Sequence, residues 1–268
     1  MPGTRHPVVY RRAMSITTTE ELAGMRRAGR VVADALAAMR QAVVPGASPA
    51  DIEAVGADIL RRHGARAAPM VVYGAPCAAF ISVNDAVVHG LPTRTKLRAG
   101  DLVKIDVTPE LDGFIADGAI TVAVEPSTSR GRRLAQSAER ALAAALAQVR
   151  PGMAVHALGA IIDRQVTRDG FSVIRDLTGH GVGRTIHEPP EVPNYDPGGR
   201  SPLLTDGLVI AIEPLVAERS GAIRLSSDRW TIATRDGGWT AHCEHTIVVT
   251  ADGALVLTAL PADDETTH

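Results

Sequence analysis

The sequence repeats one order of segments at an offset of 106 residues, and this repeat limits the possible folds most strongly. In each half an amphipathic helix stops at Pro-Gly, a second helix follows, and an apolar strand comes next. Because this shared order is harder to obtain by chance than single matches, we predict an α+β fold of two pseudo-symmetric halves, with helices outside a curved antiparallel sheet. The aligned positions include Pro45 with Pro151, Gly46 with Gly152, Gly64 with Gly170 and Leu102 with Leu208.

Caps, stops and apolar runs place the expected elements. Helices are predicted at 22–43, 48–63, 131–149 and 155–167. Extended chain is predicted at 71–88, 102–108, 114–124, 208–216, 230–234 and 244–250. With no low-complexity linker between the halves, we expect one domain over 16–260, a flexible lead at 1–15 and a flexible tail at 261–268.

Composition narrows the class of protein. A formal net charge of -2 gives no basic field, so nucleic acid is not expected as a partner. No apolar run reaches the roughly 18 residues that span a bilayer, and no apolar signal core follows the N-terminal arginines, so no membrane partner is expected. Two cysteines are too few for a disulfide scaffold. We therefore expect a cytoplasmic protein.

Acidic residues interrupt strands that are otherwise apolar. Asp106 lies in one arm of a predicted hairpin and Asp117 in the other. If Leu111 and Asp112 form the loop, the two aspartates face each other, where like charges repel and burial costs several kcal/mol each. Exposure of one or both acids to solvent is the alternative. A bound cation would remove both penalties.

The pattern recurs in the second half. Glu213 lies inside the apolar segment 208–216, and Glu244 begins the apolar segment 244–250. His180 between glycines is a candidate neutral ligand, although a histidine in such a loop is more often structural. Four carboxylates with one imidazole suit Mn, Fe(II) or Co at least as well as Zn. We predict two divalent metal ions held by Asp106, Asp117, His180, Glu213 and Glu244.

These residues stand in stretches that together resemble the single-domain, bacterial (type I) methionine aminopeptidases over roughly residues 16–257. The stretches are 81–85 (ISVND), 89–92 (HGLP), 105–107 (IDV), 113–117 (GFIAD), 179–184 (GHGVGR), 187–189 (HEP), 212–214 (IEP) and 244–250 (EHTIVVT). The resemblance implies the pita-bread fold, which agrees with the two halves.

The resemblance also implies an activity. This is removal of N-terminal methionine from nascent proteins and peptides, with a small second residue preferred, by attack of a metal-bridging hydroxide on the first peptide carbonyl. Asp106 would bind one metal, Asp117 and Glu244 would bridge, and His180 and Glu213 would complete the other. Catalytic roles are implied for His89, His187 and Glu213. The partners would be N-termini of nascent chains, near the ribosome, and the protein would be a monomer.

Three positions depart from the family pattern. Phe80 stands where Cys or Thr is usual at the methionine pocket, and Ile186 stands where Phe is usual, which can be a compensating exchange or can narrow the pocket. Trp230 matches the family's pocket tryptophan. Gly118 follows Asp117, so a hydrogen bond to the bridging acid is expected to be missing.

Two other functions remain open from the sequence. One is a dinuclear metallo-aminopeptidase of the prolidase or aminopeptidase P kind, which would add a large N-terminal domain and cleave before proline. The other is a relative with this fold that has lost catalysis and acts as a binding protein. The complete set of five ligands argues against the second.

Overall fold

The computed structural model describes residues 15–260 of the chain. The predicted tail 261–268 lies outside this range, as does the predicted lead apart from Ser15, which forms a β-bridge with Leu208. Within this range, no helix has both the length and the apolar character needed to cross a membrane.

Four long helices form where the sequence predicts them, to within three residues at each end. They are α1 (Thr19–Gln41), α2 (Pro49–Arg62), α4 (Ser129–Leu146) and α5 (Val155–Arg168). Side-chain caps begin three of them, α1, α2 and α4. Ser48 and Asp51 form a reciprocal capping box at α2, and the side chain of Thr128 accepts a hydrogen bond from Gly131 N at α4.

The internal repeat is visible in the backbone. Gly46 and Gly152, which the 106-residue offset aligns, adopt nearly the same left-handed conformation, with φ of 85° and 83°. Gly64 and Gly170 likewise share positive φ after the second helix of each half. Glycine takes this conformation without steric cost. The two halves therefore turn in the same way at equivalent points.

One antiparallel sheet of eight strands runs through both halves, in the order β10-β9-β11-β16-β7-β4-β2, with β17 also paired to β16. These strands are β2 (Phe80–Val83), β4 (Leu102–Val107), β7 (Gly118–Ala123), β9 (Thr178–Gly181), β10 (Glu188–Pro193), β11 (Val209–Ile212), β16 (Glu244–Thr250) and β17 (Gly253–Val256). The halves meet where β7 pairs with β16.

Three small sheets complete the fold. The first contains β1 (Arg66–Ala67), β5 (Pro109–Leu111) and β6 (Phe114–Ile115). The second contains β8 (Ser172–Val173), β12 (Leu215–Ala217) and β15 (Thr240–His242). The third contains β3 (Ala86–Val88), β13 (Ile223–Leu225) and β14 (Ile232–Thr234).

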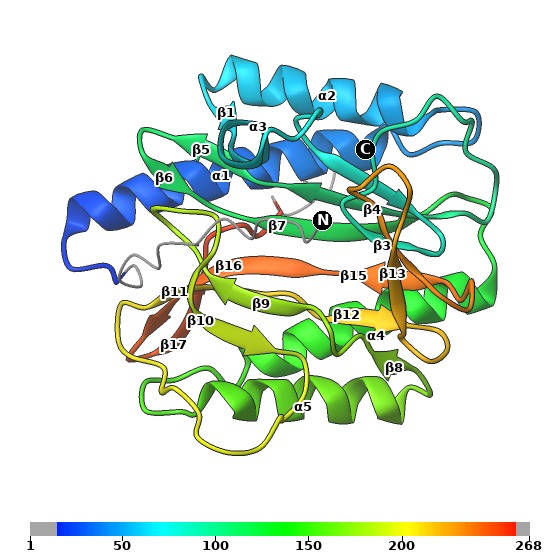
Figure 1. The fold of residues 1–268 in the computed structure, drawn as a ribbon. Coiled ribbons are helices and arrows are strands. Elements are labelled where there is room, and N and C mark those ends of the chain that lie inside the picture. The colour runs from blue at the N-terminus through cyan, green and yellow to red at the C-terminus, as the bar shows by residue number, and fades with distance from the viewer. Residues whose placement is uncertain (1–14, 261–268) are drawn as a thin grey trace, which may run out of the picture.

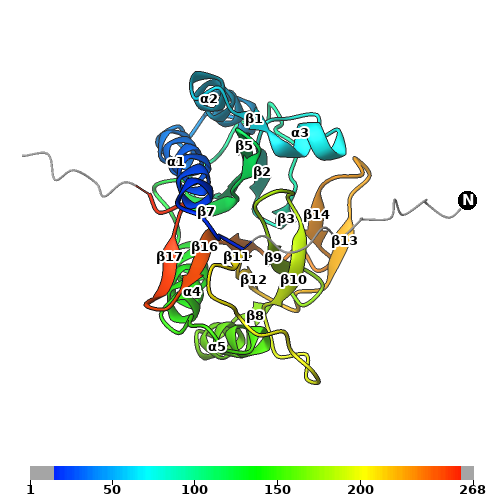
Figure 2. The same ribbon diagram turned by 90° about the vertical axis from the view of Figure 1, so that its left-hand side faces the viewer.

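The helices cover the outer face of the sheet and leave its inner face to the site. Figure 1 shows α1 and α2 over one half and α4 and α5 over the other, and the turned view in Figure 2 shows all four along the outside. Each helix pair has its own apolar core against the sheet, one including Val103 and the other including Ile210. The predicted layering is confirmed.

The hairpin register differs from the prediction by two residues. The turn is Asp112-Gly113, with φ of 53° and 79°, as a tight hairpin turn of mirror-image type requires. Asp106 consequently pairs with Ala119 rather than with Asp117. Because side chains alternate along a strand, a shift of two keeps both aspartates on the same face.

Three segments predicted to be extended are interrupted. The segment 114–124 divides into β6 and β7, with Ala116 and Asp117 between them. Residues 68–73 form the short helix α3 (Ala68–Tyr73), because Pro69 suits a first helical turn and Gly74, with φ of 69°, ends it. The segment 208–216 divides into β11 and β12 at Glu213-Pro214, where proline offers no N–H for the ladder.

Packing against α1 explains why glycine occupies position 118. A Cβ at this position would lie 2.7 Å from Val32 Cγ1 of α1. We expect Gly118→Ala to lower the free energy of unfolding by about 1–3 kcal/mol, as overpacking does. Urea denaturation measures this change. The double variant Gly118→Ala/Val32→Ala should lose less unfolding free energy than the two single variants together. If the two losses simply add, the contact between positions 118 and 32 is not the cause.

Candidate metal centre

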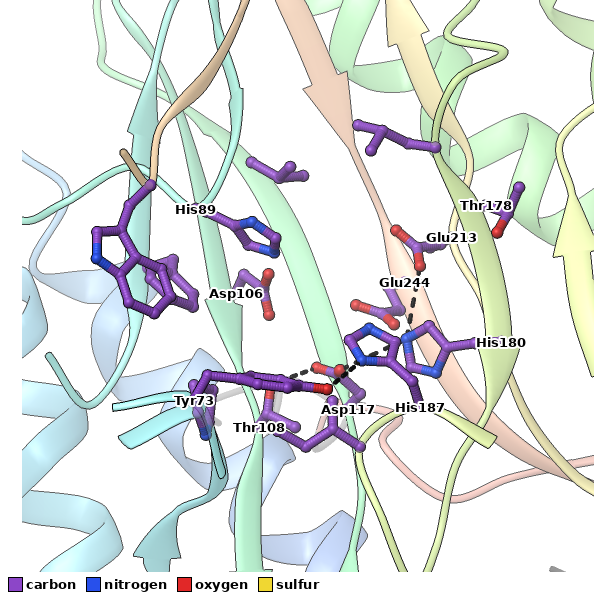
Figure 3. A pocket seen from close by; sticks show the side chains of 16 residues that line it. Tyr73, His89, Asp106, Thr108, Asp117, Thr178, His180, His187, Glu213 and Glu244 are labelled. Atoms are coloured by element: carbon purple, nitrogen blue, oxygen red, sulfur yellow. Dashed lines mark hydrogen bonds and ion pairs between the residues drawn. The ribbon is translucent and has the colours of Figure 1, made fainter. Parts of the chain in front are cut away.

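A pocket of about 140 Å³ opens on the inner face of the sheet, and all five predicted metal ligands line it. Figure 3 shows their side chains converging from both halves of the molecule. Asp106 comes from β4, His180 from β9, and Glu244 begins β16. Asp117 directly precedes β7, and Glu213 directly follows β11. The predicted convergence of these residues is therefore present in the structure.

Asp117 is held across the seam between the halves. Thr246 Oγ1 of β16 accepts a hydrogen bond from Asp117 N and donates one to Asp117 O, both at 2.8 Å. Thr108 Oγ1 donates to Asp117 Oδ1, also at 2.8 Å. The expectation that Gly118 leaves this acid without a hydrogen bond is wrong, because Thr108, which lies between β4 and β5, supplies the donor.

His180 presents one ring nitrogen to the acids. Its Nδ1 lies 3.0 Å from Gly181 O, which fixes the proton on Nδ1 and leaves Nε2 as the free lone pair. That Nε2 lies 3.7 Å from Glu213 Oε1 and 3.9 Å from Asp117 Oδ2. Gly179 allows β9 to lie close to β11, since a Cβ at this position would lie 2.5 Å from Ala211 O.

Burial dominates the electrostatics of the cluster. It raises the pKa of Asp106, Glu213 and Glu244 well above the ordinary carboxyl value, and the neighbouring carboxylates raise it further. Burial also raises the pKa of Asp117, although the hydrogen bond from Thr108 opposes this. Without a cation, burial therefore shifts these carboxyl groups toward their protonated forms.

The residues fit divalent cations. Asp106 Oδ1 and Glu244 Oε1 are buried and have no hydrogen-bond partner among residues 15–260. One ligand atom from each of Asp117, His180 and Glu244 lies within 4.8 Å of the others. Buried oxygens without partners, grouped with an oriented imidazole, are what a hard or borderline metal ion requires.

Two further histidines flank the acids. His89 has the left-handed φ of 56°, uncommon for a residue other than glycine, in a loop that Gly90 N anchors on Ser82 Oγ at 3.0 Å. His187 packs edge-on against His180 with ring centroids 4.3 Å apart. Burial lowers the pKa of both His89 and His187 to about 4, so each is neutral at physiological pH.

Tyr73 is a site residue that the sequence reasoning missed. Its hydroxyl lies 2.6 Å from His187 Nδ1. Burial raises the pKa of Tyr73, so the phenol keeps its proton and donates to the neutral ring. His187 then carries its own proton on Nε2. No sequence pattern marked Tyr73, because its segment was predicted to be extended and α3 places it at the rim.

An apolar recess adjoins the acids. The rings of Phe80 and Trp230 lie 5.8 Å apart and tilted by 32°, and Phe80 also lies 5.0 Å from the ring of His89. Ile186 is buried in the same lining. The three positions predicted to form a side-chain pocket therefore lie around one cavity with the carboxylate cluster.

Comparison with known proteins identifies the family. The profile of metallopeptidase family M24 matches residues 23–251. The chain belongs to this family. It is 39% identical over 249 residues to methionine aminopeptidase 2 of Bacillus subtilis (strain 168), which covers 92% of this chain and 100% of that protein. It is 39% identical over 254 residues to methionine aminopeptidase of Escherichia coli (strain K12), with 94% and 96% covered.

Solved structures agree with the fold of this metallopeptidase. The crystal structure of methionine aminopeptidase from Thermotoga maritima superposes with a TM-score of 0.88 at 38% identity, covering 91% of this chain and 99% of that one. Prolidase from Pyrococcus furiosus superposes with a TM-score of 0.74 at 23% identity, and this chain spans 66% of it. The predicted pita-bread fold and the resemblance to methionine aminopeptidases are confirmed.

Metal removal should destabilise the metallopeptidase more at higher pH. Raised carboxyl pKa values mean that the metal-free folded chain binds extra protons. The stability that these protons contribute is complete below the ordinary carboxyl pKa values of 3.8 and 4.5. It is lost as the pH rises through the raised pKa values. A cation instead needs deprotonated ligands. We expect the difference in Tm between metal-loaded and chelator-treated protein to widen from about pH 6 to about pH 8 in scanning calorimetry. A constant difference would contradict this account.

Tyr73→Phe tests the hydrogen bond to His187. The variant keeps the ring and removes the donor, so the orientation and tautomer of His187 lose their restraint. We expect a fall of roughly two- to tenfold in kcat, the kinetic equivalent of about 0.5–1.5 kcal/mol for one hydrogen bond. Steady-state kinetics measures it, with His187→Ala as the reference. If Tyr73→Phe still lowers kcat in the His187→Ala background, the two residues act separately.

Proposed function

We propose that this metallopeptidase removes the N-terminal methionine of proteins and peptides, with a small second residue preferred. The observation that carries the proposal is the apolar recess of Phe80, Ile186 and Trp230, which opens directly onto the cluster of buried acids. One cavity can thus take an apolar first side chain and present its peptide bond to the reacting groups. The methionine aminopeptidases above, 38–39% identical over nearly the whole chain, support the same activity.

The same five residues would hold the metal ions. Asp106, Asp117, His180, Glu213 and Glu244 all line the pocket, and the division of roles that the family resemblance implies would make Asp117 and Glu244 the ligands shared by two ions. The support is that the acids come from both halves, with Asp117 and Glu244 close to His180 between them. The oxygen-rich set favours Mn, Fe(II) or Co at least as well as Zn.

Divalent cations held there would supply Lewis-acid chemistry, lowering the pKa of a water and polarising the first peptide carbonyl. The other steps belong to side chains of the pocket. Glu213 accepts the proton of the attacking water, because its burial favours the protonated acid. His187 donates Nε2–H to the carbonyl oxygen, with Tyr73 holding its other nitrogen. His89 hydrogen-bonds the scissile nitrogen from the opposite side.

Methionine suits the recess for physical reasons. A flexible, unbranched thioether fills an irregular apolar space and makes favourable contacts with aromatic rings, here those of Phe80 and Trp230. We read Phe80 and Ile186 as an exchange of bulk: the large ring comes from β2, and the smaller side chain stands beside His187. Both are buried against the cavity, so the exchange preserves an enclosed lining.

The cellular setting is part of the proposal. We place the enzyme in the cytoplasm, as a monomer, acting on nascent chains near the ribosome. Its substrate supports this setting, because N-terminal methionine is present on newly made polypeptides. Cys77 and Cys243 are both free and buried, which agrees with a reducing compartment.

The test strips the metal and adds back Mn, Fe(II), Co or Zn singly. Each form is assayed with Met-Ala-Ser, Leu-Ala-Ser and Ala-Pro-Ala, and Met-Leu-Ser tests the preference for a small second residue. We expect metal-dependent release of methionine from Met-Ala-Ser alone or far above the others. Glu213→Gln, nearly the same size but unable to accept the proton, should lower kcat by at least about 10²-fold.

The outcomes separate the alternatives. Metal-dependent cleavage with preference for leucine would keep the hydrolase and reject the methionine assignment, with Phe80 and Ile186 as the cause to examine. Cleavage of Ala-Pro-Ala would favour an activity of the aminopeptidase P kind. No cleavage with any metal would favour a binding protein that has lost catalysis.

A further inference from the structure

His242 is a buried histidine at the metal centre that neither the ligand set nor the mechanism above includes. It ends β15, two residues before Glu244, and is 2% exposed. Alternation along the extended chain places its side chain on the same face as Glu244, while Cys243 faces the apolar core between them. The side chain therefore points into the inner face, toward the acids.

The distances from its ring match those of the predicted ligand His180. His242 Nε2 lies 3.5 Å from Glu213 Oε2 and 3.8 Å from Glu244 Oε2. His180 Nε2 lies 3.7 Å from the other oxygen of the same glutamate, Oε1. The two imidazoles thus flank Glu213, one beside each carboxylate oxygen.

The two-fold relation between the halves makes His242 the counterpart of Asp117. Thr246 Oγ1 accepts from the N–H and donates to the carbonyl of Asp117 across the β7–β16 seam. Thr121 Oγ1 does the same for His242, at 2.8 Å and 2.7 Å. The local symmetry of the seam therefore gives both residues the same backbone setting. In the second half, this setting presents an imidazole where the first half presents a carboxylate.

The surroundings of the ring distinguish a ligand from a hydrogen-bond donor. Metal-bound histidines almost always donate their second ring N–H to a fixed acceptor, as His180 does to Gly181 O. In the part of the chain that the structure describes, His242 Nδ1 is buried and has no such acceptor, and its Nε2 has no hydrogen-bond partner nearer than the acids. A proton on Nε2 faces two carboxylates, whereas a proton on Nδ1 would be buried without a partner.

We propose that His242 is a positioning residue whose Nε2–H donates to Glu213 Oε2 and fixes that carboxylate for metal binding. The donor holds one oxygen of Glu213 and leaves Oε1, beside His180, for the metal centre. Glu213 has little other restraint, since Asn194 Nδ2 holds only its backbone carbonyl, at 3.0 Å. The inference rests on the proposed metal centre and not on the methionine specificity.

The experiment measures metal binding without substrate, so it stands apart from the peptidase assay. Titration calorimetry of chelator-treated protein with Mn or Co compares the unmodified chain with His242→Leu and His242→Gln. We expect His242→Leu to weaken metal affinity by about 10–100-fold, the usual loss when the partner of a ligand is removed. His242→Gln keeps an N–H donor at the end of its side chain and should recover most of the affinity. In the peptidase assay kcat should fall with KM nearly unchanged.

His245→Leu is the matched control, because His245 lies on β16 with its Nδ1 2.9 Å from Thr258 Oγ1, away from the acids. It should keep the metal affinity. Equal weakening in His245→Leu would overturn the proposal in favour of general packing. So would an unchanged affinity in His242→Leu.

X-ray absorption on the metal-loaded protein gives a further check. Loss of one imidazole ligand in His242→Gln would make His242 a ligand instead. If His242→Leu does not fold, the Gln variant and the absorption measurement still decide.

Discussion

Four carboxylates share one buried pocket on the inner face of the sheet. The free-energy cost of burying them together is the constraint on which the arrangement around them depends. Burial raises the pKa of every one of them, and mutual repulsion adds to the shift for Asp106, Glu213 and Glu244. The imidazoles around them are themselves neutral, because burial lowers their pKa to about 4. Divalent cations would stabilise the ionised form of all four carboxylates, with His180 as a neutral ligand.

The pseudo-symmetric sheet explains how one chain brings these acids together. Each half supplies a strand that carries an acid at or just beyond its end, β4 with Asp106 and β11 with Glu213. The central strands β7 and β16 then bring Asp117 and Glu244 to the seam. Helices on the outside leave the inner face free for this purpose. The loops that carry His89 and His187 add the groups that differ between the halves.

Much of this arrangement could be predicted from the sequence because it depends on local chemistry and on repetition. Acids within apolar strands were informative because burial of charge is costly. The hairpin register was not predictable with the same rules, since the choice between Leu111-Asp112 and Asp112-Gly113 as the turn changes it by two residues. The position of Tyr73 depends on how α3 folds against the rim. His242 could have been found by alternation, two residues before Glu244.

The seam between the halves has a consequence for the whole molecule. β7 and β16 pair at two positions, Glu244 with Ala119 and His245 with Gly118. The two proposed bridging acids stand on opposite sides of this short contact. Metal ions bound there would act as a non-covalent cross-link between the two halves of the sheet. Substitutions deep in either apolar core, far from any ligand, would then change how tightly the metal ions bind. The metal affinity would therefore depend on how well the two halves pack together.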